Sequence, residues 1–420
     1  MKIRNLKKDK EATLNVGYVS PGWPLSHFPN GIVAYIQNII VGLDEKTKAI
    51  VFARLVEGFE ANKNVINLSN FNPTRSRLQK LVNKILARIK LPYFQSVLYQ
   101  RDFACHAQNQ ILAIQSAEVD LDILEMEESF GLADFLIKMS KVPVVIRLHG
   151  PYFTMLPILK LKNDTGYKLR VFYEGEAIKN SQGITSPSLD ILQKVREYYG
   201  LGLPNAVVIP NPVPSVNESE RWKLNTIKIP SILFVGRFDL HKAGDLMLDA
   251  FRLIALQNKE VELVFVGPDR GVNLNGESIG FNHYLERFIP EATIKKRVQF
   301  LGHCDSQTIA KLRSGSLVTV FPSRYENFPV SLLEALAAGC PTVATAVGGI
   351  KEIIVDNYNG LLAEPNSAES IAEKVLELID NPEKMQLLSK NAIKDCTERF
   401  SPKVIAAQTV DYYQSVLARC

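Results

Sequence analysis

SILFVGRFDLHKAGDLMLDAF, residues 231–251, joins an apolar run to a helical pattern through a loop that carries two cations. The apolar run ends at Gly236, Arg237 and Lys242 lie in the loop, and apolar residues recur at helical spacing after Gly244. A short apolar run followed by such a pattern is typical of a buried parallel strand and its crossover helix. The segment therefore predicts an α/β domain with a positively charged loop at a strand end.

The same alternation of strands and helices occurs in both halves of the chain. A Pro-rich junction at 207–222 divides it into domains at 1–214 and 215–399, and a closing helix at 400–420 is expected to pack back towards the N-terminal domain. Since ligands bind beyond the carboxyl ends of strands in open α/β sheets, we expect two doubly wound, Rossmann-like domains that face each other across a cleft. The expected strands are 14–20, 49–55, 121–127, 142–150, 182–188, 231–236, 261–267, 297–302, 317–323 and 342–348.

Composition excludes several classes of protein. The chain has 420 residues, of which 46% are apolar and 22% charged, as in ordinary globular proteins. Its five cysteines lack C-x-x-C spacing, so neither a disulfide framework nor a zinc site is indicated. No apolar run is long enough to span a membrane, and no apolar segment follows the basic start of the chain, so a cytoplasmic location is expected.

Positive charge is concentrated in one segment. The net charge of +5 is too small to indicate a nucleic-acid partner, but residues 71–101 hold seven basic residues and no acidic one. Apolar residues recur at helical spacing there, which predicts a basic amphipathic helix over 75–90. The favoured interpretation is a helix with a solvated face; the alternative is peripheral contact with an anionic membrane at the inner face.

The two cations of the opening segment suit an anionic ligand. Arginine forms two-pronged bonds to phosphate oxygens, and lysine supplies a mobile point charge. The alternative is that both are surface residues and that one pairs with Asp239.

A second constellation lies at 321–349, FPSRYENFPVSLLEALAAGCPTVATAVGG. Asn327 suits an N-cap and Pro329 a first helical turn, so the N–H groups of Val330 and Ser331 would form an anion site. Glu326, before the helix, is a candidate for binding sugar hydroxyls, and Glu334, eight residues later, for binding a ribose diol. The alternative makes Glu326 a dipole-compensating acid and Glu334 a solvated helix residue.

These motifs together resemble the retaining glycosyltransferases of family 4, which have the GT-B architecture. The resemblance rests on VGRFDLHKAGDLMLDAF, on PSRYENFPVSLLEALAAGCPTVATAVGGIKEII with its E-x7-E spacing, and on FSPKVIAAQTVDYYQSVL. It is specific in the C-terminal half and follows only the outline of the first half. It implies an enzyme that moves a sugar, with retention of configuration, from a nucleotide-diphosphate donor to a glycan, lipid or small-molecule acceptor.

The resemblance also implies roles for individual residues. Arg237 and Lys242 would hold the donor diphosphate, and Glu334 would bind the ribose. The donor sugar and its phosphates would be bound by Glu326 and by the backbone of Asn327, Phe328, Pro329 and Val330. In the first domain, Gly31 would let backbone approach phosphate, and His149 would reach the donor sugar. The family's frequent Gly-Gly pair is replaced here by Asn30-Gly31. UDP is the commonest nucleotide among relatives.

No metal or other cofactor is expected, because cations and a helix N-terminus can stabilise the leaving diphosphate. Asp120 and Asp122 have the D-x-D spacing of metal-dependent glycosyltransferases of another fold, but we interpret them as the polar entry to a strand. Glu127 and Glu128, near a strand end, are candidates for acceptor contacts. The alternatives are a sugar-nucleotide epimerase or phosphorylase of the same fold, and a nucleotide-sugar-binding scaffold without turnover.

Overall fold

The structure, a computed structural model, describes residues 13–58, 64–71, 109, 113, 120–159, 163–274 and 276–420. The chain forms two compact units: the first runs to Pro210 and takes up Pro402–Cys420, and the second is Asn211–Ser401. Within those residues, no helix combines the length and the apolar character needed to cross a membrane. The basic helix expected at 75–90 lies outside the described part of the chain.

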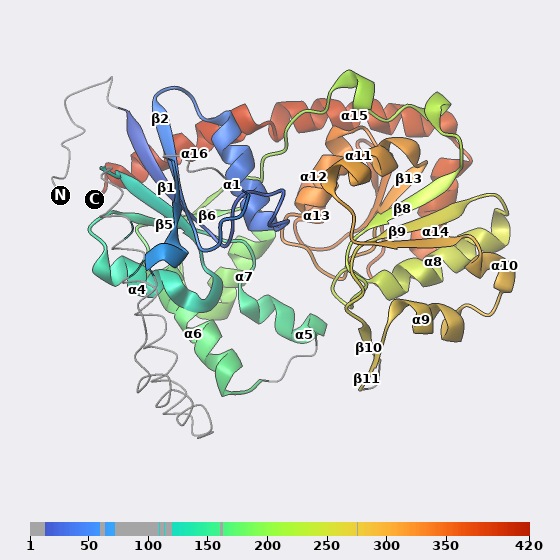
Figure 1. The fold of residues 1–420 in the computed structure, drawn as a ribbon, viewed down its shortest axis with the longest axis horizontal. Helices are drawn as coiled ribbons and strands as arrows, with labels where there is room; N and C mark the ends of the chain where they lie inside the picture. The colour runs from blue at the N-terminus through green and yellow to red at the C-terminus, as the bar shows by residue number, and fades with distance from the viewer. Residues whose placement is uncertain are drawn as a thin grey trace. The chain divides into compact units, whose positions relative to one another are not determined.

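The first unit is built on a seven-stranded parallel sheet, in the order β3-β2-β1-β4-β5-β6-β7 (Figure 1). The strand order reverses between β1 and β4, as in doubly wound folds. Each strand expected in this half overlaps an observed strand, whereas the short β3 and β7 were not predicted. The strands are β1 Leu14–Ser20, β2 Thr47–Ala53, β3 Val65–Asn67, β4 Ile123–Glu127, β5 Val144–Arg147, β6 Gly183–Ser186 and β7 Val207–Val208.

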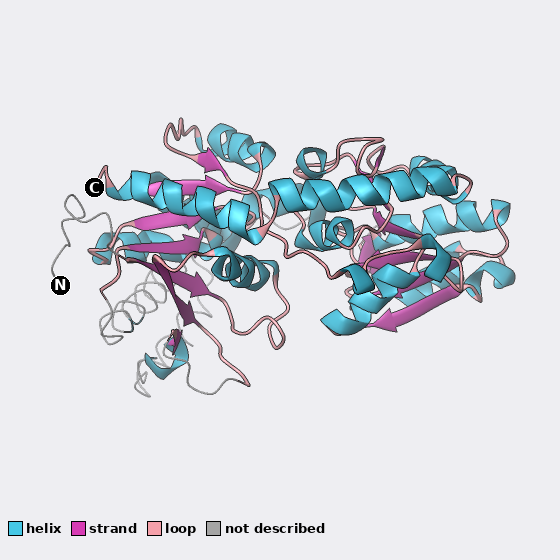
Figure 2. Ribbon diagram, turned by 90° about the horizontal axis from the view of Figure 1, so that it is seen from above, coloured by secondary structure: helices cyan, strands magenta, loops and turns pink. Residues whose placement is uncertain are grey.

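Helices cover both faces of this sheet (Figure 2). The helices α1, Gly31–Gly42, and α16, Pro402–Leu417, pack together on one face, where Tyr413 and Val416 are buried. The other face carries α4 Leu132–Met139, α6 Thr165–Asn180 and α7 Leu189–Tyr199. Shorter elements are α5 Leu156–Leu159 and the 3₁₀ turns η1 Leu68–Phe71, η2 Ser129–Gly131 and η3 Tyr152–Met155.

The second unit repeats this design with a six-stranded parallel sheet, in the order β12-β9-β8-β13-β14-β15. Numbered within the unit, this is the 3-2-1-4-5-6 order of a dinucleotide-binding fold, and it reverses between β8 and β13. The strands are β8 Ser231–Val235, β9 Glu262–Val266, β12 Val298–Gly302, β13 Val318–Phe321, β14 Thr342–Thr345 and β15 Leu361–Ala363. The antiparallel pair β10 Val272–Leu274 and β11 Glu277–Ile279 forms a separate ribbon.

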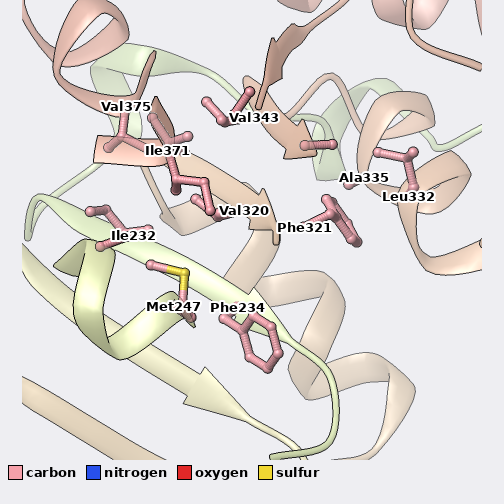
Figure 3. Close-up of a cluster of buried hydrophobic side chains, with 14 of the residues drawn as sticks. Ile232, Phe234, Met247, Val320, Phe321, Leu332, Ala335, Val343, Ile371 and Val375 are labelled. Atoms are coloured by element: carbon pink, nitrogen blue, oxygen red, sulfur yellow. The ribbon is translucent and has the colours of Figure 1, made fainter. Parts of the chain in front are cut away.

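The core of the second unit lies between the sheet and its helices. Figure 3 shows Ile232, Phe234 and Val320 of the strands close to Met247 of α8 and Ile371 of α14. The helices are α8 Gly244–Gln257, α9 Phe281–Phe288, α10 Ala292–Lys295, α11 Ser306–Gly315, α12 Val330–Ala337, α13 Ile350–Ile353, α14 Ala368–Ile379 and α15 Pro382–Arg399, with 3₁₀ turns at η4 Glu218–Glu220 and η5 Leu224–Thr226.

Both units are therefore parallel-sheet α/β domains with the doubly wound order, as the alternation of strands and helices predicted. The Pro-rich junction contains β7 as well as the passage from one unit to the other at Pro210–Asn211.

Candidate functional site

The two loops that carry most of the expected residues flank the point where the strand order of the second unit reverses. The strands β8 and β13 are parallel neighbours, so their carboxyl ends lie at the same sheet edge. Arg237 and Lys242 follow β8, and Glu326 follows β13. Ligands of open α/β sheets bind at such a reversal point. The fold thus brings together residues 84 or more positions apart in the sequence.

Lys242 and Glu326 are in direct contact. The Lys242 Nζ donates to Glu326 Oε1 at 2.5 Å, and the Ser323 hydroxyl donates to the same oxygen at 2.7 Å. Burial acts to raise the pKa of Glu326, but Lys242 and His241 outweigh it and hold that pKa below its usual value. Glu326 is therefore an ionised, hydrogen-bonded acceptor beside a lysine whose ammonium group has further donors.

Arg324 joins the same two loops, a role that the sequence analysis did not predict. Its guanidinium donates to both carboxylate oxygens of Asp245, at 2.8 and 2.7 Å, and to the carbonyl of Leu240 at 2.9 Å. Its backbone N–H donates to the His241 carbonyl at 3.0 Å. The loop that carries Lys242 is thus fixed against the loop that carries Glu326.

Arg237 is the more exposed of the two expected cations. Its Nε donates to Asp239 Oδ2 at 2.6 Å, the pairing that the surface-residue alternative anticipated, and 45% of its side chain is exposed. Asp239 also accepts from the Lys242 backbone N–H at 2.7 Å, so it shapes the loop as well as pairing with arginine. A guanidinium group has five N–H donors, so this half-exposed side chain can donate to an anionic ligand while it stays paired with the buried Asp239.

The helix after Glu326 begins later than the sequence indicated. The prediction that Asn327 is the N-cap is wrong. Pro329 occupies the N-cap position without a side-chain hydrogen bond to the helix, and α12 starts at Val330. The first N–H groups of α12 are those of Val330 and Ser331, as expected, and such groups lack intrahelical acceptors. Phe328 is buried in the core, and its carbonyl accepts from Asn211 Nδ2 at 2.9 Å.

Gly348 explains how the Glu326 loop is supported. Its φ is +48°, and a Cβ there would lie 2.0 Å from the Glu326 carbonyl oxygen. That carbonyl accepts from the Gly349 N–H at 3.0 Å. Only glycine allows backbone to approach Glu326 this closely.

Glu334 lies on α12 and is not simply solvated. Its Oε2 accepts from Arg313 Nη2 at 2.6 Å, and Arg313 itself is buried. Because 40% of the Glu334 side chain is exposed, the carboxylate is both anchored and accessible. This arrangement suits an acceptor for ligand hydroxyl groups.

In the first unit, the structure brings the start of α1 close to the end of β5. Gly31 is the first residue of α1, behind an N-cap at Asn30 whose side chain accepts from Ile32 N at 2.8 Å. One turn later, the Tyr35 ring packs edge-on against the His149 ring, with centroids 5.2 Å apart. Burial, and secondly the charge of Arg147, hold the pKa of His149 well below its usual value, so the imidazole is neutral at pH 7.

A buried polar cluster lies on the α1 and α16 face of the first unit. The Tyr413 hydroxyl of α16 donates to Glu125 Oε2 at 2.7 Å, and the Arg147 guanidinium stacks over the Tyr35 ring at 4.5 Å. Glu125 and Arg147 are 2% and 1% exposed. The sequence signal for this cluster was the presence of charged residues, Glu125 and Arg147, within short buried strands.

The D-x-D pair lies at the opposite edge of the sheet from His149. Asp122 Oδ2 accepts from the Asn15 N–H at 2.8 Å, and the Asp120 carbonyl accepts from Asn15 Nδ2 at 2.8 Å. These bonds join the starts of β1 and β4, which is the structural role that we inferred.

Comparison with known proteins shows the family to which the chain belongs. A family model described as glycosyl transferases group 1 matches residues 216–395. An uncharacterized glycosyltransferase of Methanocaldococcus jannaschii is 30% identical over 285 residues, which are 67% of this chain and 72% of the relative. The chain belongs to the glycosyl transferases group 1 family.

The matched group 1 region contains all the site residues of the second unit. A further uncharacterized glycosyltransferase of the same organism is 34% identical over 183 residues, 44% of either chain, so this match spans less than half of the relative. Among solved structures, sucrose-phosphate synthase of Thermosynechococcus elongatus has a TM-score of 0.70 at 18% identity, covering 97% of this chain and all of that one. HepE of Anabaena, solved with UDP-glucose, has a TM-score of 0.63 at 18% identity, covering 96% of this chain and all of that one. These likenesses show the GT-B fold.

Proposed function

We propose that the protein is a retaining, metal-independent glycosyltransferase that takes a sugar from a UDP-linked donor. The observation that carries this proposal is the Lys242–Glu326 contact across the reversal point of the second sheet, beside the start of α12. A cation, an ionised carboxylate and the N–H groups of a helix end match the charges and hydroxyls of a sugar diphosphate.

In this proposal Arg237 and Lys242 bind the diphosphate, and the first N–H groups of α12 add to the positive field. Breaking the sugar–phosphate bond builds negative charge on the leaving group, and preorganised donors stabilise that charge where it develops. Lys242 can keep one bond to Glu326 while it donates to phosphate, because an ammonium group has three donors. Glu326 then orients sugar hydroxyls, and Glu334 accepts from the ribose.

For Gly31 and His149, which lie in the first unit, contact with a sugar donor is what the family resemblance implies. A neutral imidazole can accept or donate a hydrogen bond to a sugar hydroxyl without adding charge. UDP is favoured as the nucleotide because HepE, which shares the fold, was solved with UDP and with UDP-glucose. Retention of configuration follows the family resemblance, and the acceptor is a glycan, a lipid or a small molecule.

The decisive experiment measures nucleoside-diphosphate release from UDP-, GDP- and ADP-sugars, with and without EDTA. We expect one donor to be turned over in the presence of EDTA, and Arg237→Ala to lower that rate about 10- to 100-fold, as the loss of a charge-assisted bond to phosphate predicts. Arg287→Ala is the matched control, because Arg287 forms an exposed ion pair with Glu277 in the same unit.

Three outcomes would contradict the proposal in different ways. Turnover abolished by EDTA would exclude metal independence. Donor binding without release, even with acceptor extract, would favour a binding scaffold. Inversion of the anomeric configuration, seen in the proton NMR spectrum of the product, would exclude the retaining mechanism.

A further inference from the structure

The segment after β5, His149-Gly150-Pro151-Tyr152, has all its backbone donors bound by two buried carboxylates. Glu128 Oε2 accepts from the His149 N–H at 2.9 Å, and Glu128 Oε1 accepts from the Gly150 N–H at 2.6 Å. Glu174 Oε2 accepts from the Tyr152 N–H at 2.7 Å. Pro151 has no N–H, so the segment has three donors and all three end on a carboxylate.

The two carboxylates come from different elements and are completely buried. Glu128 follows β4, the neighbour of β5, and Glu174 lies in the middle of α6; each is 0% exposed. Glu128 has both oxygens bound to this segment, so our expectation that it contacts an acceptor is wrong. A buried carboxyl group is costly unless it is hydrogen-bonded, and the N–H groups of this segment bond to both Glu128 and Glu174.

Glu174 also connects the segment to the neighbouring turn. Its Oε1 accepts from the Phe130 N–H at 3.0 Å and from Arg170 Nε at 2.9 Å. The Arg170 guanidinium stacks on the Phe130 ring at 3.8 Å and on the Tyr152 ring at 3.6 Å. The turns after β4 and β5 are therefore fastened to α6 by one arginine–glutamate pair.

The turn after β4 needs such support. Phe130, in this turn, has a φ of +62°, which is rare for a non-glycine residue. Local conformations of this kind persist only where the surrounding structure determines them. The bond from the Phe130 N–H to Glu174 helps to determine the conformation of this turn, and the same carboxyl group binds the Tyr152 N–H in the segment that holds His149.

We propose that Glu128 and Glu174 are positioning residues that hold His149 at the orientation needed for sugar transfer. Glu128 fixes the backbone of His149 from one side, and the Tyr35 ring contacts the imidazole from α1. The inference rests on the proposed function, because it gives His149 its role at the donor sugar. A displacement of about 1 Å in such a group lowers turnover about 100-fold.

The test compares Glu128→Gln and Glu174→Gln with Asp134→Asn. Glutamine keeps the size of the side chain but replaces one acceptor with an NH₂ group, which cannot accept an N–H. Asp134 is an equally buried carboxylate of the first unit that binds Lys138 and Asn180 instead of the segment, so it controls for lost stability. Glu174→Gln weakens the hydrogen bonds to the Tyr152 and Phe130 N–H groups and leaves the hydrogen bond of the His149 N–H in place. It replaces Glu128→Gln as the test variant if Glu128→Gln does not fold.

We expect Glu128→Gln to lower kcat for donor turnover at least 10-fold, while the Kd for UDP, measured by calorimetry, changes less than twofold. Nucleotide affinity should persist because Arg237, Lys242 and Glu334 belong to the second unit. Asp134→Asn should leave kcat within twofold. Equal losses of kcat in Glu128→Gln and Asp134→Asn would overturn the proposal, because they would show a general structural effect.

A second readout needs no turnover. In protein labelled with ¹³C-histidine, the His149 imidazole signals, assigned with a His149→Gln variant, should shift in Glu128→Gln and stay in place in Asp134→Asn. Unchanged His149 signals in Glu128→Gln would overturn the proposal. If the wild-type protein releases no nucleoside diphosphate, the proposed function fails, while the NMR result still decides whether Glu128 positions His149.

Discussion

The two sheets present different chemistry at their carboxyl edges, although their strand orders are alike. In the second unit, side chains meet side chains: Lys242 contacts Glu326, and Arg324 binds Asp245. In the first unit, Glu128 and Glu174 bind backbone N–H groups, and Glu174 also pairs with Arg170. The side chains of Lys242 and Arg324 are 22% and 24% exposed, so an anionic ligand can reach these cations, whereas carboxyl groups buried against backbone keep a turn fixed whether or not a ligand is bound.

The same residue type is also tuned in opposite directions. The pKa of Glu326 is lowered, because Lys242 and His241 outweigh its burial. The pKa of Glu128 is raised to about 8, first by burial and then by the charge of Glu174. The carboxyl edge of the second sheet thus holds a charged acceptor that suits a ligand. The carboxyl edge of the first sheet holds a carboxyl group that is hydrogen-bonded to the protein's own backbone.

The largest effect should come from breaking the side-chain contact with Lys242→Ala. We expect donor turnover to fall about 10²- to 10³-fold, as for the loss of a transition-state donor, and the free energy of unfolding to fall by about 2 kcal/mol, because Glu326 loses a charged partner. Nucleoside-diphosphate release and urea unfolding measure the two effects. The double variant Lys242→Ala/Glu326→Gln should regain part of the stability; strictly additive losses would show that the two side chains are not coupled.

A smaller effect, on stability alone, is expected for Tyr413→Phe. The change leaves Glu125 Oε2, which is buried, without its 2.7 Å donor, at a cost of about 1–3 kcal/mol. Thermal unfolding followed by hydrogen exchange should show the loss in the first unit only. Tyr358→Phe, at an exposed tyrosine of the second unit, should change little. Loss of protection in the second unit would argue against two separate cores.

The pH dependence of stability should identify the buried carboxyl of Glu128. The folded state keeps its proton up to about pH 8, while the unfolded state releases it near 4.5. The folded protein binds more protons between these values, so its free energy of unfolding should fall as pH rises through this range. Glu174 and Arg170 of α6, His149 after β5, and Tyr199 of α7 share this environment.

In Glu128→Gln this part of the slope should disappear, so the variant should gain stability relative to the wild-type protein as pH rises from 5 to 8.5. Urea unfolding at several pH values measures the difference. Parallel curves for the two proteins would show that Glu128 does not keep its proton.

The smallest effect on stability is expected for Gly31→Ala. A Cβ at Gly31 has no atom within 4 Å, and Gly31 lies in a helix, so alanine should change the free energy of unfolding by less than about 1 kcal/mol, towards greater stability. If backbone here approaches a phosphate, donor turnover should nevertheless fall. Unchanged turnover would remove Gly31 from the site.

Much of the fold could be predicted because buried parallel strands are continuous apolar runs. β1 was placed at its observed bounds, and β8, β9 and β12 within one residue at either end. The strands β3, β7, β10, β11 and β15 were missed, because a strand of two or three residues carries no periodic signal. The start of α12 was placed about two residues too early, because Asn327 is of a type favoured at the N-cap, whereas the structure has Pro329 at that position.

The sequence indicated which residues are candidates for the site, but it did not indicate which of them contact one another. Arg237, Lys242 and Glu326 were expected at strand ends, where the structure places them, and their roles stay predictions. The Lys242–Glu326 contact and the Arg324–Asp245 pair depend on β8 lying beside β13, which local sequence does not specify. For the same reason Glu174, in the middle of a helix, gave no signal that it holds Tyr152.

The return of α16 to the first unit affects how the chain folds during synthesis. The ribosome synthesises all of Asn211–Ser401 before it reaches Pro402–Leu417, so every part of the second unit emerges before the helix that covers one face of the first unit's sheet. Until Tyr413 and Val416 emerge, the apolar residues of that face stay open to water and to chaperones. A premature stop near codon 400 would therefore damage the half of the protein that was translated first.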